Sequence, residues 1–146
     1  MEPGTSPLAR GIAGADYSVY LFEGLKAEGN GVLHVTSHRF SEPRCLEMLA
    51  LAHTVVAIHG CSGDARICVG GLDKSLAALL TTALIGASYP AIASGHEFPA
   101  RRPANICNRG SRGMGAQLEI SGDLRTPEHI NYIATAVRQA LAGGSM

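Results

Sequence analysis

The sequence carries little charge and no excess of either sign. Charged residues make up 16% of the 146 positions, and the formal net charge is zero. A domain that neutralises nucleic-acid phosphates is usually basic, so the neutral balance disfavours a nucleic-acid partner. No apolar run is long enough to cross a membrane, and no secretory signal opens the sequence. With 46% hydrophobic residues, the composition is instead typical of one compact globular domain.

Several familiar catalytic and metal-binding patterns are also absent. There is no Gly-x-Ser-x-Gly elbow, no phosphate-binding Gly-x-x-x-x-Gly-Lys segment and no His-Glu-x-x-His helix. The four cysteines form no Cys-x-x-Cys pair. They lie in or beside apolar runs, which predicts buried, reduced thiols and favours a reducing compartment.

The most informative segment that is present covers residues 54–60. It is a continuous apolar run that ends in His59 and Gly60, which predicts a buried strand. Open α/β sheets bind ligands just beyond the carboxyl ends of their strands. His59 is therefore a candidate metal ligand or general base, with a purely structural hydrogen bond as the alternative. Gly60 leaves the backbone free to turn and leaves space beside the histidine.

Strand-like and helical segments alternate along the chain, although some strands are consecutive. This order predicts an α/β fold: a single domain with a mixed β-sheet flanked by helices on both faces. We expect strands at 17–23, 31–36, 54–60, 66–70, 91–94, 103–107 and 116–120, and helices at 6–14, 43–51, 72–84 and 127–141.

Glu119 stands between two apolar residues of the strand predicted at 116–120. Period-two alternation places Gln117 and Glu119 on the same face of that strand. A carboxylate there is costly unless it is paired, bound to a metal or open to a cleft. Two interpretations stay open, a general base near His59 and a residue on an exposed sheet face.

Basic residues are concentrated between Glu97 and Glu119, where no carboxylate occurs. This segment forms either an anion-binding rim or a solvated loop. The rim is a candidate because the guanidinium group of arginine can form two parallel hydrogen bonds to a carboxylate. His34 lies on a predicted strand and faces either the same cleft or the sheet surface. Arg39 follows in the next loop, where it could contact a substrate. The basic residues between Glu97 and Glu119 are Arg101, Arg102, Arg109 and Arg112.

An ordered set of short segments resembles the poly-gamma-glutamate hydrolase family, whose founding members are phage enzymes. The resemblance covers nearly the whole chain. It implies a zinc peptidase with a carboxypeptidase-A-like α/β fold. The matching segments are residues 2–6, 16–24, 34–37, 58–60, 69–73, 105–110 and 117–119.

The resemblance also implies roles for individual residues. The family holds Zn²⁺ with two histidines and a glutamate, and here Glu2 and His59 match the glutamate and the later histidine. Glu119 matches the catalytic glutamate, and Arg109 matches an arginine that would contact a substrate carboxylate. The implied substrate is anionic polyglutamate or a gamma-glutamyl peptide, with further contacts from His34, Arg39 and Arg112.

One expected zinc ligand has no counterpart in this sequence. The family's first histidine, and the strand that leads into it, would precede Met1. We therefore expect a single domain over residues 1–146 that lacks this strand. Three explanations are open: a truncated chain, which we favour, a substitute ligand such as Cys61 or His34, or an inactive relative.

The missing ligand also leaves a second function open. The alternative to a zinc-dependent gamma-glutamyl hydrolase is a non-catalytic, carboxypeptidase-like domain that binds an anionic polymer. The expected location is the cytoplasm, or outside the cell after lysis if the protein is phage-derived. The sequence makes no prediction of the oligomeric state.

Overall fold

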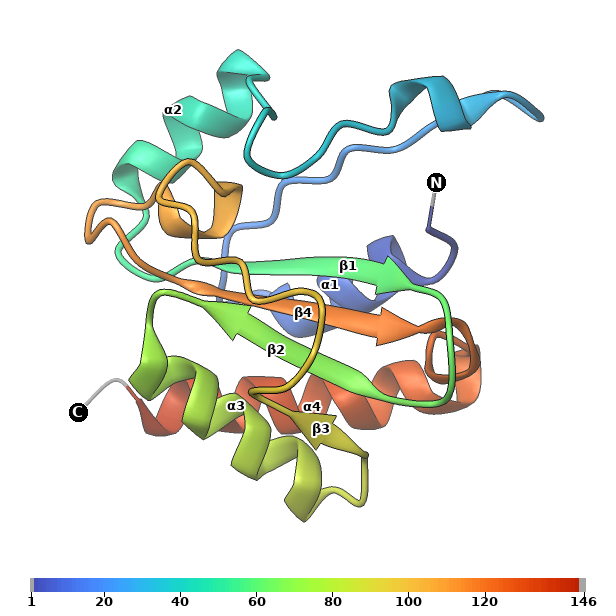
Figure 1. Ribbon diagram of the computed structural model, residues 1–146, viewed down its shortest axis with the longest axis vertical. Helices are drawn as coiled ribbons and strands as arrows, with labels where there is room; N and C mark the ends of the chain where they lie inside the picture. The colour runs from blue at the N-terminus through green and yellow to red at the C-terminus, as the bar shows by residue number, and fades with distance from the viewer. Residues whose placement is uncertain (1, 145–146) are drawn as a thin grey trace.

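The computed structural model describes residues 2–144, which contain one small sheet and several helices (Figure 1). The α-helices are α1 (Thr5–Ala13), α2 (Pro43–Leu51), α3 (Lys74–Gly86) and α4 (Pro127–Gly143). The strands are β1 (Val56–Cys61), β2 (Ile67–Gly71), β3 (Ala91–Ile92) and β4 (Ala116–Ser121). Three short 3₁₀ helices are η1 (Asn30–Leu33), η2 (Ile106–Asn108) and η3 (Gly122–Leu124).

The strands form a mixed sheet in the order β1-β4-β2-β3. Strand β4 runs parallel to β1 and antiparallel to β2, and β3 is parallel to β2. The predicted mixed α/β sheet is therefore confirmed. Strand β1 lies at the edge of the sheet, and its register with β4 places His59 opposite Glu119.

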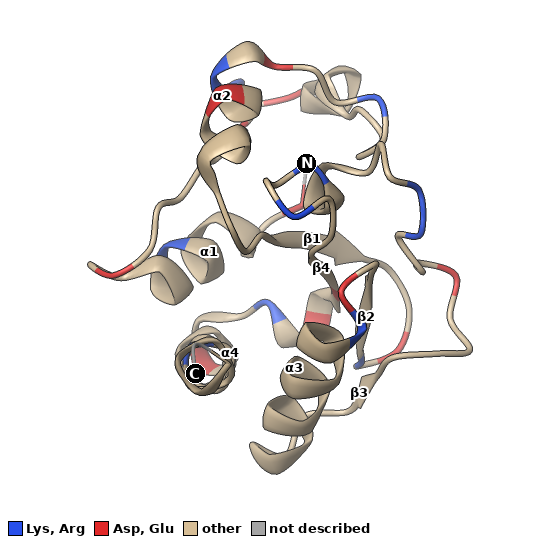
Figure 2. Ribbon diagram, turned by 90° about the vertical axis from the view of Figure 1, so that its left-hand side faces the viewer, with Lys and Arg blue, Asp and Glu red and all other residues tan. Residues whose placement is uncertain are grey.

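The main core lies between the sheet and three helices. Helices α1, α3 and α4 lie on one side of the sheet, and α4 contacts both of the others (Figure 2). Fully buried Leu118 and Ile120 of β4 pack there with Ile133 and Val137 of α4. The short helix η2 contacts β1 and β4, and its neighbour Asn105 bonds to Gln117, which points to the opposite face from Leu118. Helices thus flank both faces.

Local sequence explains where the two longest helices begin. Asp73 precedes α3, and its carboxylate accepts a hydrogen bond from the Leu76 N–H at 3.0 Å. Pro127 occupies the first turn of α4, where its fixed φ and missing N–H are tolerated. Both starts agree with the sequence prediction to within about two residues.

Three predicted strands are wrong. Residues 17–23 and 31–36 contain no strand, although η1 covers part of the second range. A strand is stable only when its backbone groups pair with a neighbour, and neither segment has one in the described chain. Residues 103–107 also fail to form a strand, because the Asn105 side chain accepts the Cys107 N–H at 3.1 Å and caps η2 instead.

The cysteine prediction is confirmed, since all four thiols are free and buried. Within residues 2–144, no helix combines the length and apolar character that crossing a membrane requires.

Candidate metal and catalytic site

His59 and Glu119 lie side by side at the centre of the candidate site. They are register partners on parallel neighbouring strands, so their side chains project from the same face of the sheet. Gln117 shares that face, as the period-two pattern predicted, and Glu119 is only 9% exposed. The interpretation of Glu119 as a residue on an exposed sheet face is therefore wrong.

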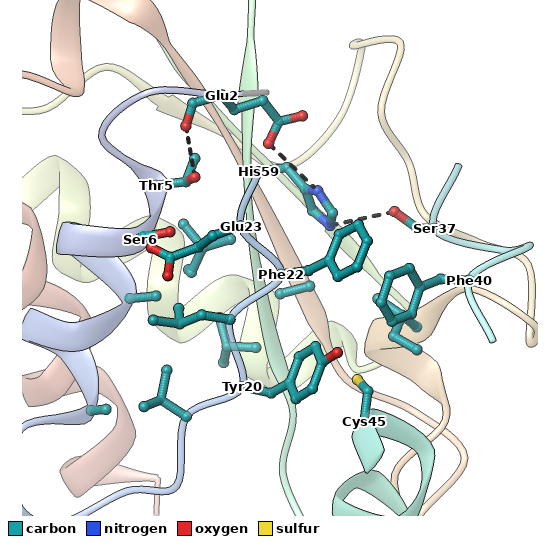
Figure 3. Close-up of a pocket in the computed structure, with 18 of the residues that line it drawn as sticks. Glu2, Thr5, Ser6, Tyr20, Phe22, Glu23, Ser37, Phe40, Cys45 and His59 are labelled. Atoms are coloured by element: carbon teal, nitrogen blue, oxygen red, sulfur yellow. Dashed lines mark hydrogen bonds and ion pairs between the residues drawn. The ribbon is translucent and has the colours of Figure 1, made fainter. Parts of the chain in front are cut away.

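Glu2 reaches the end of β1 through a backbone contact. The Gly60 N–H donates to Glu2 Oε2 at 2.9 Å, and the same oxygen lies 3.9 Å from His59 Nδ1 (Figure 3). The Thr5 hydroxyl donates to the Glu2 carbonyl at 2.8 Å and holds the segment in place. Glu2 and His59, the two implied zinc ligands present in this sequence, are thus neighbours.

The space beside Gly60 allows this approach. A Cβ at position 60 would lie 2.9 Å from the Glu2 Cβ and 2.6 Å from the Arg125 Cζ. Both distances are shorter than normal Cβ contacts, so a side chain at position 60 would force Glu2 or Arg125 to move. The sequence prediction that Gly60 leaves space beside His59 is confirmed.

His59 is held from both sides of its ring. Its Nε2 lies 3.3 Å from the Ser37 Oγ, opposite the contact with Glu2. Burial lowers the pKa of His59, the carboxylate of Glu2 opposes this effect, and the nearby His34 adds to the lowering. The ring is therefore mostly neutral at pH 7, which is the form that binds a metal.

Glu119 lies at the end of a hydrogen-bonded chain formed with the buried side-chain amides of Gln117 and Asn105. Gln117 Nε2 donates to Glu119 Oε1 at 2.8 Å, and Gln117 Oε1 accepts from Asn105 Nδ2 at 3.2 Å. Burial, with a further contribution from the Glu2 carboxylate, raises the pKa of Glu119 to about 8, and Arg125 opposes the shift. Glu119 can therefore hold and release a proton near neutral pH.

The donor set for a metal ion is incomplete. Glu2 Oε1 also lies 3.9 Å from His34 Nε2, but His34 is exposed. Among residues 2–144, no group of three or more His, Cys, Asp or Glu side chains is arranged to hold a metal. Catalytic zinc uses three protein ligands. The residues described here therefore do not by themselves form a complete zinc site.

Arg109 and Arg112, two of the predicted substrate contacts, are both bonded to residues other than His59 and Glu119. Arg112 pairs with Asp73 at 2.9 Å, near the Gly71–Ala116 end of the β2–β4 pairing. That end lies about 10 Å along the strand from Glu119. Arg109 donates to the Phe40 carbonyl at 3.0 Å.

Of the arginines predicted to contact substrate, Arg39 lies nearest the site along the chain, on the loop at 37–40. Arg39 is exposed on this loop, two residues after Ser37, which contacts His59. Arg109 supports the same loop through its bond to Phe40. Of the predicted substrate contacts, His34 and Arg39 are therefore placed near the histidine.

Two residues of the site were missed by the sequence reasoning. Arg125 donates through Nε to the Ile120 carbonyl at 3.0 Å and through its guanidinium to the Pro3 carbonyl. It thereby ties the end of β4 to the segment that carries Glu2. Ser37 was missed as well, and no local pattern reveals either contact, because both depend on distant parts of the chain.

The sequence matches the family model described as poly-gamma-glutamate hydrolase over residues 1–138, and the chain belongs to this family. Two proteins of Bacillus subtilis (strain 168) are similar over 128 residues, which is 86% of this chain. The UPF0714 protein YndL is 42% identical, and the SPbeta prophage-derived UPF0714 protein YoqZ is 40% identical. The match covers 50% and 46% of their lengths, so this chain spans about half of each.

Two solved structures share the fold. A bacteriophage poly-gamma-glutamate hydrolase matches 98% of this chain with a TM-score of 0.94 and 32% identity. YndL in a zinc-free form matches 99% with a TM-score of 0.91 and 34% identity. This chain covers 78% and 80% of those two chains. The predicted fold class is confirmed.

Proposed function

We propose that this chain carries at least part of a zinc-dependent hydrolase that cleaves gamma-glutamyl amide bonds in poly-gamma-glutamate. The observation that carries the proposal is the register pair of His59 and Glu119, with Glu2 held beside it by the Gly60 N–H. Family membership supports the substrate. The zinc-free form in which YndL was solved supports the metal.

Each residue has a defined task in this proposal. Glu2 and His59 supply two ligands, and bound zinc would polarise a carbonyl and lower the pKa of its water. Glu119 is the general acid–base. Its Oε1 is held by Gln117, and Oε2 makes no hydrogen bond with any described residue. Oε2 is therefore the oxygen that would take up and return a proton.

Substrate carboxylates would meet the exposed side chains around the site. We assign this contact to His34 and Arg39, which lie on the segments that approach Glu2 and His59. Arg109 would act by supporting the loop at 37–40. Arg112, which is paired with Asp73, would serve more distant parts of a long polymer.

Cleavage of poly-gamma-glutamate with and without added zinc tests the proposal. We expect zinc-dependent shortening of the polymer, measured by size-exclusion chromatography, and loss of that activity in Glu119→Gln. The matched control is Glu47→Gln, an exposed carboxylate on α2, which should leave cleavage unchanged. Full activity of Glu119→Gln would exclude Glu119 as the acid–base, and preference for alpha-linked glutamyl peptides would exclude the substrate.

A second candidate function is binding of an anionic polymer without cleavage. The incomplete donor set favours it, since zinc affinity depends strongly on the number of ligands. Calorimetry of this chain with zinc and with poly-gamma-glutamate separates the two functions. Tight polymer binding without zinc uptake supports the second candidate, whereas zinc uptake followed by cleavage supports the first.

A further inference from the structure

The sheet face that carries Glu119 continues onto β2, where it holds an arginine. Cys68 is the register partner of Glu119 on the side away from His59. These three residues therefore form a row across β1, β4 and β2. Arg66 precedes Cys68 by two residues, so alternation places its side chain on the same face. Its backbone is fixed opposite Ser121, whose N–H donates to the Arg66 carbonyl at 3.1 Å and whose Oγ accepts the Arg66 N–H at 3.0 Å.

The guanidinium group of Arg66 forms an ion pair near the Cys68 end of this row. Its Nη2 donates to Glu97 Oε1 at 2.6 Å. Burial raises the pKa of the Cys68 thiol, Arg66 opposes this shift, and Glu97 adds to it. Glu97 also contributes to the raised pKa of Glu119, after burial and the carboxylate of Glu2. The charges of the pair therefore act on the side of Glu119 that lies away from His59.

The hydrogen-bonding capacity of Arg66 is only partly used. Nε and Nη2 lie on one edge of the planar guanidinium group, and this edge can bind both oxygens of a carboxylate through two parallel hydrogen bonds. Glu97 bonds to Nη2, whereas Nε is buried and has no hydrogen-bond partner among the described residues. A buried donor without a partner costs free energy. A carboxylate that bonds to both nitrogens would therefore be favoured over Glu97.

Little free energy is needed to displace Glu97 from Arg66. The Glu97 side chain is 56% exposed and the Arg66 side chain is 33% exposed, and an ion pair at this degree of exposure is weakened by water and salt. The Glu97 carboxylate makes no other hydrogen bond within residues 2–144. It therefore occupies the guanidinium group in the way that a competing carboxylate would, but with one hydrogen bond instead of two.

We propose that Arg66 binds a free alpha-carboxylate of poly-gamma-glutamate, and that Glu97 is an internal competitor which this carboxylate displaces. The identity of the ligand rests on the proposed function. Every residue of a gamma-linked chain keeps one free alpha-carboxylate, so an extended polymer presents anions at regular intervals. Arg39 lies on the loop that reaches His59 through Ser37, at the other end of the row. A polymer that crosses the row would thus meet an arginine on each side of Glu119.

Calorimetric titration with penta-gamma-glutamate tests the proposal without requiring cleavage, because a chelator keeps the chain free of metal. Arg66→Gln should raise Kd by about 10-fold or more, since it removes a charge-assisted, two-bond contact. Glu97→Gln should lower Kd by about 2–5-fold, since it removes an exposed competitor. In the Arg66→Gln background, Glu97→Gln should have no effect, and this double-mutant cycle separates competition at Arg66 from a general effect of charge.

Two further variants and one modified ligand serve as controls. Arg66→Lys keeps the charge but loses the two-nitrogen edge, so it should recover only part of the affinity. Arg10→Gln removes an arginine from another exposed ion pair, with Glu23, on a helix at the opposite face of the sheet, and should leave Kd unchanged. Conversion of the alpha-carboxylates of the pentamer to amides should weaken binding to the wild type by about 10-fold or more. Circular dichroism checks that each variant is folded.

Any of four results would overturn the proposal. These are no binding of the pentamer to the wild type, equal Kd values for Arg66→Gln and Arg10→Gln, an effect of Glu97→Gln that persists without Arg66, and equal binding of the amidated pentamer. Cleavage assays separate this proposal from the proposed function. Arg66-dependent binding without any cleavage would remove the hydrolase and support the Arg66 contact, whereas zinc-dependent cleavage with Arg66-independent binding would overturn the contact alone.

Discussion

Replacing Glu119 by glutamine should change how the stability of the fold depends on pH. Glu119 is 9% exposed, and burial together with Glu2 raises its pKa from 4.5 to about 8. A group whose pKa is raised by folding contributes stability below its unfolded pKa and loses that contribution as the pH rises through the folded pKa. The wild-type protein should therefore lose stability between about pH 4.5 and pH 8.

The size of the effect follows from the same pKa values. At pH 7 the carboxyl group lies 2.5 pH units above its ordinary pKa of 4.5 and remains mostly protonated in the fold. At about 1.4 kcal/mol per unit, holding that proton costs roughly 3 kcal/mol of folding free energy. Glutamine does not titrate, and its carbonyl oxygen can still accept from Gln117. Glu119→Gln should be more stable than wild type at pH 7 by up to about 3 kcal/mol.

Urea denaturation followed by circular dichroism measures this difference. Both proteins are unfolded at several pH values between 4.5 and 8, with a chelator present to keep the site free of metal. Titration of His59 affects both proteins, so the difference between them isolates Glu119. Glu47→Gln, which alters an exposed carboxylate, should follow wild type. Parallel pH profiles for wild type and Glu119→Gln would refute the reasoning.

Three other substitutions test packing and polar contacts by thermal denaturation. Gly60→Ala forces a Cβ to within 2.6 Å of Arg125 and should lower the free energy of unfolding by about 1–3 kcal/mol. Gly31→Ala meets open space, and an equal loss of stability there would contradict the argument. Asn108→Asp turns oxygen toward the two carbonyls that Nδ2 now contacts and should cost about 2–4 kcal/mol; an unchanged Tm would refute it. Asp73→Ala removes the α3 cap and should cost about 1–2 kcal/mol, and no loss would show that the cap is dispensable.

The strands that build the site could be predicted from sequence because their own residues define them. The apolar runs around His59 and Glu119 are long enough to indicate buried strands, and period-two alternation gives the face of Glu119. The general rule for α/β sheets then places chemistry at the end of β1. The register of the two strands is not contained in either segment, since it depends on their pairing in the fold.

The segments at 17–23 and 31–36, which were wrongly predicted as strands, have no strand to pair with in the described chain. Residues 17–23 have strand-like composition, yet β-propensity describes how well side chains fit a pleated surface and not an intrinsic backbone preference. Charge counts along the sequence do not reveal that Arg112 pairs with Asp73 or that Arg109 bonds to a carbonyl.

The incomplete donor set and the free edge of the sheet lie at the same place. His59 is carried by β1, the edge strand of the described sheet, and the Gly60 N–H holds Glu2 against the end of that strand. This N–H points away from β4, so Glu2 lies on the unpaired side of β1. A third protein ligand on that side would complete the set of three that catalytic zinc uses. Because zinc affinity depends on the number of ligands, the affinity of this chain alone is expected to be a lower limit.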